Sequence, residues 1–164
     1  MKKIVSLIVL IVGISYASGV KPVDNQLYKD ECASCHFGFQ PGLLPARSWV
    51  KLMGDLENHF KDDASLDKKD VETLTQYLVK NSSDNSRNYK RSRKITDSIP
   101  RSSTPVRVSQ TPYFKKEHRE LRETMISQKE VKSIANCTAC HTTASKGVYK
   151  ERYINIPNYG KWDD

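Results

Sequence analysis

The chain has 164 residues and a formal net charge of +8, with 27 basic and 19 acidic side chains. Its hydrophobic content of 37% is too low for two ordinary hydrophobic cores, and beyond the N-terminus no stretch is apolar enough to span a membrane. The excess positive charge suits an acidic protein partner or a membrane surface, or nucleic acid in a protein that stays in the cytoplasm.

The N-terminus has the pattern of a signal peptide. Lys2 and Lys3 precede a mostly apolar run over residues 4–14, and small residues up to Ala17 provide a cleavage site. We expect removal of residues 1–17; an uncleaved anchor is the alternative, but the run is shorter than the roughly 18–20 residues that cross a bilayer. Cleavage removes two lysines, which lowers the charge from +8 to +6 over the remaining 147 residues. Export to the periplasm argues against a nucleic-acid partner and against stable membrane insertion after cleavage.

Two copies of Cys-x-x-Cys-His, at residues 32–36 and 137–141, contain every cysteine of the chain. This is the attachment signature of c-type haem, in which two thiols add to the haem vinyl groups and the adjacent imidazole reaches the iron. The motifs predict two covalent haems. The residues predicted to attach them are Cys32, Cys35, Cys137 and Cys140, with His36 and His141 as iron ligands.

Other uses of paired cysteines explain less of the pattern. Two disulfides are compatible with export, and four cysteines could form a zinc site, but neither requires a histidine after each pair. A thioredoxin-type dithiol needs a strand before the motif and a helix after it, and no β-rich run lies beside either copy.

The first half of the chain has helical periodicity. We expect one helix from about residue 24 to the first motif, followed by a non-helical loop at residues 40–45. A second helix is expected to begin near Ser48, with His59 at the edge of its apolar stripe. A third helix is expected over residues 67–80, capped by Asp67.

The composition then changes over a polar, basic and serine-rich segment. With Pro100 and Pro105 and no sustained period, residues 82–110 are expected to form an extended linker or surface strap, in part disordered. Its basic run consists of Lys90, Arg91, Arg93 and Lys94. This run could dock an acidic partner or could simply be solvated.

The second half restarts at Thr111-Pro112, a capping residue followed by proline at the first helical position. His118 lies in the middle of the apolar stripe of this expected helix. Ser127-x-x-Glu130 matches a capping box and predicts a further helix leading into the second motif. The tail could close over the second haem or pack as an ordinary terminus; its apolar and aromatic residues are Tyr149, Tyr153, Ile154, Ile156, Pro157 and Trp162.

The two histidines outside the motifs, His59 and His118, are predicted to be the sixth iron ligands. Each lies 23 residues from a motif histidine, His59 after the first motif and His118 before the second. This spacing favours bis-histidine ligation over the alternative ligands Met53 and Met125, because methionine on a helical stripe usually fills core space. Pairing within each half is the simplest arrangement, and exchange between halves stays open.

The predicted fold is all-α with two haem lobes: residues 18–81, an extended connecting segment at 82–110, and residues 111–164. Two nitrogen ligands leave no open position on the iron, so the predicted function is electron transfer rather than catalysis. The alternative is a small dihaem enzyme, or a gas or redox sensor, in which substrate displaces one distal histidine.

Several longer strings resemble the periplasmic dihaem cytochromes c called DHC. In the first half these are Gln-Pro-Gly-Leu-Leu-Pro-Ala-Arg-Ser-Trp at residues 40–49 and His59-Phe60; in the second, residues 111–118, 135–137 and 154–157. Lys61 departs from the family pattern, which has glycine there, and the linker is more basic than expected.

The resemblance implies two helical lobes, each with a bis-histidine haem, close enough to exchange electrons. It also implies an electron carrier that receives electrons from a membrane cytochrome b and passes them to a small oxygen-binding monohaem cytochrome c. Reduction potentials, inter-haem distance and oligomeric state do not follow from the residues.

Overall fold

The computed structural model describes residues 19–162, and its regular secondary structure is mostly helical. The predicted signal peptide, residues 1–17, lies outside the described residues. None of the described helices is long and apolar enough to cross a membrane. The elements are α1 Gln26–Cys32, η1 Pro41–Leu43, α2 Ala46–Met53, α3 Lys68–Lys80, α4 Lys90–Ser98, η2 Val108–Gln110, α5 Pro112–Glu117, α6 Glu123–Ser127, α7 Cys137–Cys140, η3 Ala144–Lys146, η4 Glu151–Tyr153, and a two-stranded antiparallel sheet of β1 Asn155–Ile156 and β2 Gly160–Lys161.

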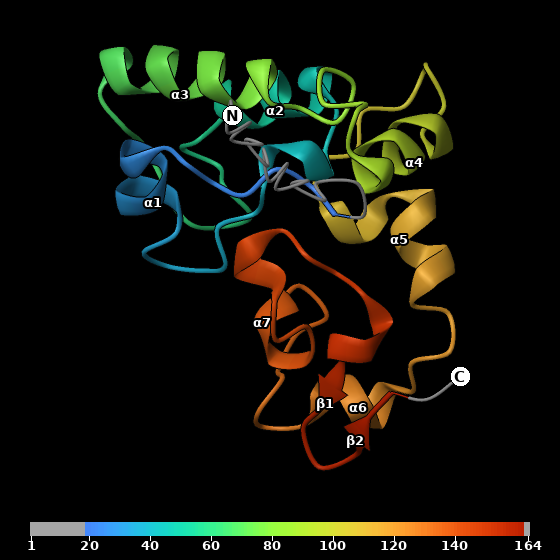
Figure 1. The fold of residues 1–164 in the computed structure, drawn as a ribbon. Helices are drawn as coiled ribbons and strands as arrows, with labels where there is room; N and C mark the ends of the chain where they lie inside the picture. The colour runs from blue at the N-terminus through green and yellow to red at the C-terminus, as the bar shows by residue number, and fades with distance from the viewer. Residues whose placement is uncertain (1–18, 163–164) are drawn as a thin grey trace, which may run out of the picture.

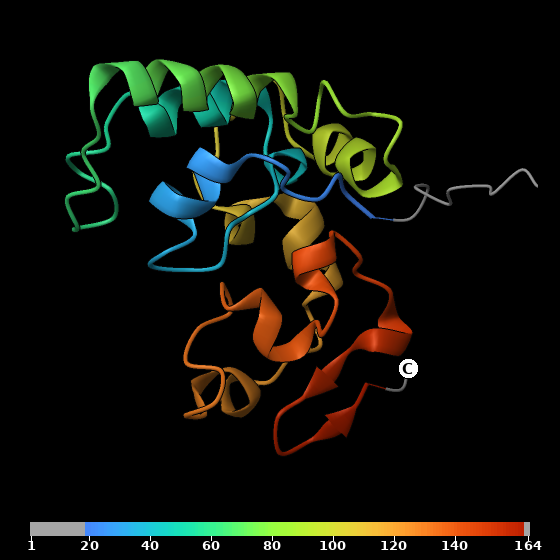
Figure 2. The ribbon, with the colours of Figure 1, turned by 60° about the vertical axis from the view of Figure 1, so that its left-hand side comes forward.

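The elements are mostly helices, which confirms the predicted all-α fold class, and they form two bodies. Helices α1 to α4 make the upper body in Figure 1, and α6, α7 and the small sheet make the lower one. The same division is visible after rotation in Figure 2, where α5 runs along the junction. The two haem motifs therefore lie in different bodies, one at the end of α1 and the other in α7.

The upper body is built on the packing of α2 against α3. Leu74 and Leu78 of α3 are 0% and 1% exposed, and they share a cluster with Trp49 and Met53 of α2. The Trp49 indole N–H donates to the Pro41 carbonyl over 2.8 Å, so the buried polar group is satisfied. This body has an apolar core that consists of its own side chains.

Caps explain where several helices begin. The Asn25 side chain accepts from the Tyr28 amide at 2.8 Å to start α1, and the Thr111 hydroxyl accepts from the Phe114 amide to start α5 at Pro112. Both starts are close to the predicted ones. Helix α3 begins directly after Asp67 as predicted, although the Asp67 side chain makes no capping hydrogen bond.

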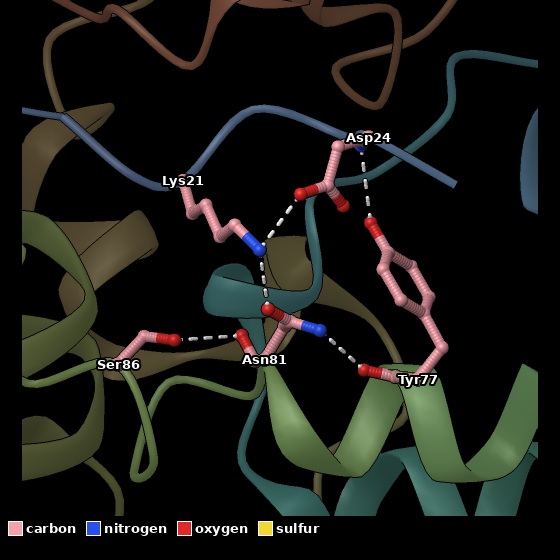
Figure 3. A network of polar contacts seen from close by, with 5 residues as sticks. All are labelled: Lys21, Asp24, Tyr77, Asn81 and Ser86. Atoms are coloured by element: carbon pink, nitrogen blue, oxygen red, sulfur yellow. Dashed lines mark hydrogen bonds and ion pairs between the residues drawn. The ribbon is translucent and has the colours of Figure 1, made fainter.

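A polar network fixes the N-terminal segment to the end of α3 (Figure 3). The Lys21 ammonium donates to the Asn81 side chain at 2.9 Å and pairs with Asp24 at 2.8 Å, while the Asp24 amide donates to the Tyr77 hydroxyl. Asn81 in turn donates to the Tyr77 carbonyl, and its own carbonyl accepts from Ser86. The network adds side-chain hydrogen bonds to the backbone ones at the C-terminal end of α3 and ties residues 21–24 to it.

The expectation of an extended, helix-free segment between the lobes is wrong. Residues 90–98 form α4, in which Ile95 is 2% exposed, and Ile99 after it is 6% exposed. Only two apolar residues of this basic stretch, Ile95 and Ile99, face inward. Two residues are too few to show the helical periodicity from which a helix is predicted. The helix is stabilised by packing against η1 and α5 rather than by its composition.

Two helices are shorter than their apolar patterns predict, and one predicted helix does not form. Helix α2 ends at Met53, so His59 lies in a turn rather than on the helix. Helix α5 ends at Glu117, and Met125 belongs to the separate α6. The predicted capping box is wrong, because Ser127 ends α6 and no helix starts there.

A second apolar cluster joins the two bodies. It combines Val20, Leu43, Ile95 and Ile99 with Cys137, Ala144 and Tyr149. Gly147, with φ of 70°, lies so close to Val20 that a Cβ would overlap the Val20 carbonyl oxygen. The N-terminal segment thus crosses the second half directly, and the lobes share a core instead of being linked only by a tether.

Candidate functional site

The first motif begins at the last residue of α1 and continues through the turn that follows. Cys32 ends the helix and is half-buried, whereas Cys35 and His36 are exposed. His36 Nδ1 lies 2.8 Å from the Phe37 carbonyl oxygen. Because a carbonyl can only accept, Nδ1 carries the proton and Nε2 is left with the lone pair that binds metal.

His59 approaches His36 from the turn after α2. The two ring centroids are 6.1 Å apart and the ring planes differ by 11°. The turn is closed by a backbone bridge between His59 and Asp62. Phe60 packs edge-on against the His59 ring at 4.7 Å, and the Arg107 guanidinium lies 3.7 Å from the Phe60 centroid.

His118 and His141 form the equivalent pair in the second half. Their ring centroids are 6.0 Å apart and their planes differ by 73°. His118 follows α5, stacks on Phe114 at 3.8 Å, and has Nδ1 2.8 Å from the Phe114 carbonyl oxygen. His141 follows α7 and is held by a backbone bridge to Ile154.

The spacing of both pairs fits an iron between the rings. A metal–imidazole bond is about 2 Å long and the ring centre lies about 1 Å behind the nitrogen, so two opposed imidazoles have centroids about 6 Å apart. The observed 6.1 and 6.0 Å match this value. The structure brings together the histidines of the same half, the pairing that the sequence left open.

A cavity of about 550 Å³ adjoins the second pair. This volume lies within the range of about 300–1,000 Å³ that is usual for cofactor sites. His118 and both cysteines of the second motif line it. Four of the six tail residues also line it: Tyr149, Ile154, Ile156 and Trp162. Tyr153, by contrast, is exposed at the surface.

The first pair is more open. A smaller cavity of about 140 Å³ touches His59, Phe60 and Leu52. His36 is exposed, whereas both histidines of the second pair are half-buried. A haem at the first position is therefore expected to be in a more polar environment than one at the second.

Burial keeps the second pair of imidazoles neutral. Desolvation, together with the charges of His118 and Arg91, lowers the pKa of His141 to about 4. Desolvation also lowers the pKa of His118, opposed by its hydrogen bond to the Phe114 carbonyl. Both groups are therefore uncharged at neutral pH, which is the form that ligates iron.

In each pair, one imidazole makes a hydrogen bond through Nδ1 and the other does not. His59 Nδ1 and His141 Nδ1 are buried without a partner among the described residues, whereas His36 and His118 use Nδ1 to bind carbonyls. A hydrogen bond from the remote nitrogen fixes a ligating ring and makes it more basic. Each pair thus combines an anchored imidazole with an unanchored one.

The thiols do not resemble a reactive dithiol. Burial raises the pKa of Cys32 to about 11 and that of Cys137 to about 12, whereas redox motifs depend on a lowered thiol pKa. Within residues 19–162 all four cysteines are free, and no three potential metal-ligating side chains converge.

The alternative methionine ligands lie in different environments. Met53 is 7% exposed and packs in the core of the upper body. Met125 is 8% exposed and lines the second cavity. The ring that lies next to His141 is that of His118, so His118 would be the residue to hold the iron from the second side and Met125 would form a wall of the cavity.

A buried polar bridge connects the neighbourhoods of the two sites. The Tyr149 hydroxyl donates to the Gln40 side-chain oxygen over 2.6 Å, and the Gln40 amide donates to the Ala144 carbonyl over 2.6 Å. Tyr149 also lies edge-on to His141 at 5.3 Å. Sequence reasoning placed Tyr149 in the tail near the second haem and Gln40 at the start of the string at residues 40–49, but it missed the contact between them.

Tyr149→Phe is expected to lower the free energy of unfolding by about 1–3 kcal/mol, because it leaves the Gln40 oxygen unpaired. Gln40 is only 1% exposed, so water cannot replace the lost donor. Thermal unfolding of the holoprotein measures the effect. Tyr153→Phe is the control, since the Tyr153 hydroxyl accepts from Arg152 at the surface. Equal midpoints for the two variants would contradict the role of the bridge.

Lys61→Gly is expected to raise the free energy of unfolding by about 1 kcal/mol. Lys61 has φ of 90°, a conformation that glycine adopts at little cost, and this explains why glycine is typical after His59-Phe60. Glu72→Gly, at an exposed position inside α3, should have the opposite sign. A lower thermal midpoint for Lys61→Gly would show that the turn is not strained.

Comparisons with known proteins find a matching family and similar solved structures. The family model described as dihaem cytochrome c matches residues 28–149. A diheme cytochrome c from Rhodobacter sphaeroides is similar in structure, with a TM-score of 0.70 and 39% identity over 79% of this chain and 100% of that one. The diheme cytochrome c from Shewanella baltica OS155 has a TM-score of 0.68 and 32% identity, covering 85% and 98% of the two chains. No curated protein sequence matches the chain.

Proposed function

The chain belongs to the dihaem cytochrome c family, and from this premise we propose that it relays electrons in the periplasm from a membrane cytochrome b to a small oxygen-binding monohaem cytochrome c. Members of this family carry two c-type haems, and so does this protein. Bound haem supplies reversible one-electron chemistry at its iron. The protein is accordingly a haem electron carrier, and the proposal concerns its compartment, ligands and partners.

We assign the attachment of the first haem to Cys32 and Cys35, and that of the second to Cys137 and Cys140. The iron ligands in this proposal are His36 with His59 and His118 with His141. The observation that carries the assignment is the centroid spacing of 6.1 and 6.0 Å within the two pairs. Two opposed imidazoles leave no coordination position for a substrate, which supports electron transfer over catalysis.

The proposed partners follow the family resemblance, and charge supports direct contact with them. The formal charge of +8 falls to +6 once Lys2 and Lys3 are removed with the signal peptide, and this positive charge favours association with an acidic surface, at a rate that falls with ionic strength.

Stopped-flow mixing tests the relay. The holoprotein, purified from the periplasmic fraction and reduced with dithionite, is mixed with an oxidised oxygen-binding monohaem cytochrome c. We expect the acceptor to be reduced faster at low salt than at high salt. No reduction of this acceptor, with both haems of the carrier still oxidisable by ferricyanide, would overturn the proposed partner while leaving the carrier function intact. Recovery of the holoprotein only from the cytoplasm would overturn the proposed compartment.

A further inference from the structure

Arg91 of α4 reaches the second haem site, although the sequence places it in a basic linker. Its Nη2 donates to the Tyr149 carbonyl at 2.7 Å and its Nη1 to the Tyr113 hydroxyl at 3.0 Å. The guanidinium carbon lies 5.3 Å from the Tyr149 ring centroid and 5.6 Å from that of Tyr113. Arg91 lines the same cavity as His118 and His141.

This guanidinium has unused capacity for a ligand. Arg91 Nε is buried and has no hydrogen-bond partner among the described residues, and a buried donor left unmet is destabilising. None of the ion pairs among these residues includes Arg91. The nearby Glu117 carboxylate accepts from the Tyr113 hydroxyl instead. A fixed, half-buried positive charge with a free donor is suited to a carboxylate.

We propose that Arg91 is a positioning residue for the second haem: its free Nε–H binds a haem propionate, and its charge raises the reduction potential of that haem relative to the first. The propionates are the negatively charged groups of haem. The cavity that Arg91 lines is also lined by His118, His141 and both cysteines of the second motif, so it is the proposed site of the second haem. A fixed positive charge near the iron favours the ferrous state, because ferrous haem carries one positive charge less than ferric haem. Neutralising a negatively charged propionate has the same effect, and both raise the reduction potential.

Among the described residues, the cations near the first site, Lys51 and Arg107, are both exposed. Arg107 lies above Phe60, but it is exposed, and water and salt screen an exposed charge. The first site is also the more open of the two. Both differences lower the potential of the first haem relative to the second. The two haems are therefore expected to be inequivalent, with the electron resting preferentially on the second.

A spectroelectrochemical titration of the holoprotein tests the role of Arg91. In Arg91→Gln we expect the reduction equilibrium constant of the second haem to fall at least tenfold, which is 59 mV for a one-electron couple. The first haem should change less than twofold. Repeating the titration in a His59→Ala background, where the first haem is spectrally distinct, identifies which haem shifts.

Arg93→Gln is the matched control, because Arg93 lies on the same helix and is exposed. Arg93→Gln removes the same charge, and it should change the reduction equilibrium constant of each haem less than twofold. Equal shifts in Arg91→Gln and Arg93→Gln, or a shift of the first haem alone, would overturn the inference.

If Arg91→Gln does not retain its second haem, a second variant, Arg91→Lys, tests the same role. Arg91→Lys keeps the charge but loses the planar fork, so the constant should stay within threefold of the parent while the thermal midpoint falls. A tenfold fall in the constant would overturn the electrostatic role. The inference rests on the proposed ligation by His118 and His141, which the spectrum of the parent protein tests separately.

Discussion

Replacing Cys137 and Cys140 with alanine is expected to leave one covalent haem and a second half without stable structure. The lower body has little core of its own: α6 has five residues and α7 has four, far fewer than an isolated helix needs to be stable in water. The buried side chains of this body instead surround the cavity of about 550 Å³. The haem supplies the apolar surface that these side chains cover.

The paired variant Cys32→Ala with Cys35→Ala should behave differently. It also loses one haem, but the 13-residue helix α3 packs on α2 through Leu74 and Leu78, which are fully buried against protein atoms. We therefore expect most of the upper body to survive. The asymmetry between the two variants, rather than a loss of stability in both, is the specific prediction.

Mass spectrometry and hydrogen exchange measure this asymmetry. Each double variant should have the mass of one haem, not two. In the Cys137/Cys140 variant, amide protection should be lost over α5 to α7 and kept in α3; in the Cys32/Cys35 variant, protection should be kept in both regions. Full protection of α7 without its haem would show that the second half folds on protein contacts alone.

The second large effect is expected from removing the proposed distal ligands. His118→Ala and His59→Ala should each convert one haem from low spin to high spin and open a coordination position. Carbon monoxide should then bind one reduced haem in each variant and none in the parent. Absorption spectra with and without carbon monoxide measure this directly.

The two variants should differ in accessibility. The second site is enclosed and the first is open, so carbon monoxide should reach the first haem of His59→Ala faster than the second haem of His118→Ala. Tyr113→Phe provides a control near the second site, because it alters an Arg91 contact without touching a ligand. Binding of carbon monoxide to the parent would instead favour an enzyme or a gas sensor.

The sequence predicted the haem chemistry better than it predicted the packing. The attachment motifs depend on covalent and metal-ligating residues at fixed spacing, which are visible without a structure. Helix α3 was predicted because its apolar residues recur regularly. The ends of α2 and α5 were not, since apolar residues after Met53 and Glu117 continue the helical spacing by coincidence while the chain turns.

The contributions of α4 and the buried bridge could not be predicted because they depend on tertiary contacts. Ile95 and Ile99 are too few to produce a recognisable period, and Arg91 looks like its solvated neighbours. Gln40 and Tyr149 are 109 residues apart, so only the fold shows that they meet. These residues connect the two lobes, which is the part of the architecture that local patterns do not encode.

Low-temperature electron paramagnetic resonance of the oxidised parent tests most directly whether each iron is held by two histidines of the same half. We expect two low-spin signals and no high-spin iron. Ligand planes that differ by 11° in the first pair and 73° in the second should give unequal g anisotropies, larger for the near-perpendicular second pair. A high-spin signal from the native protein would contradict the ligation of both irons by paired histidines.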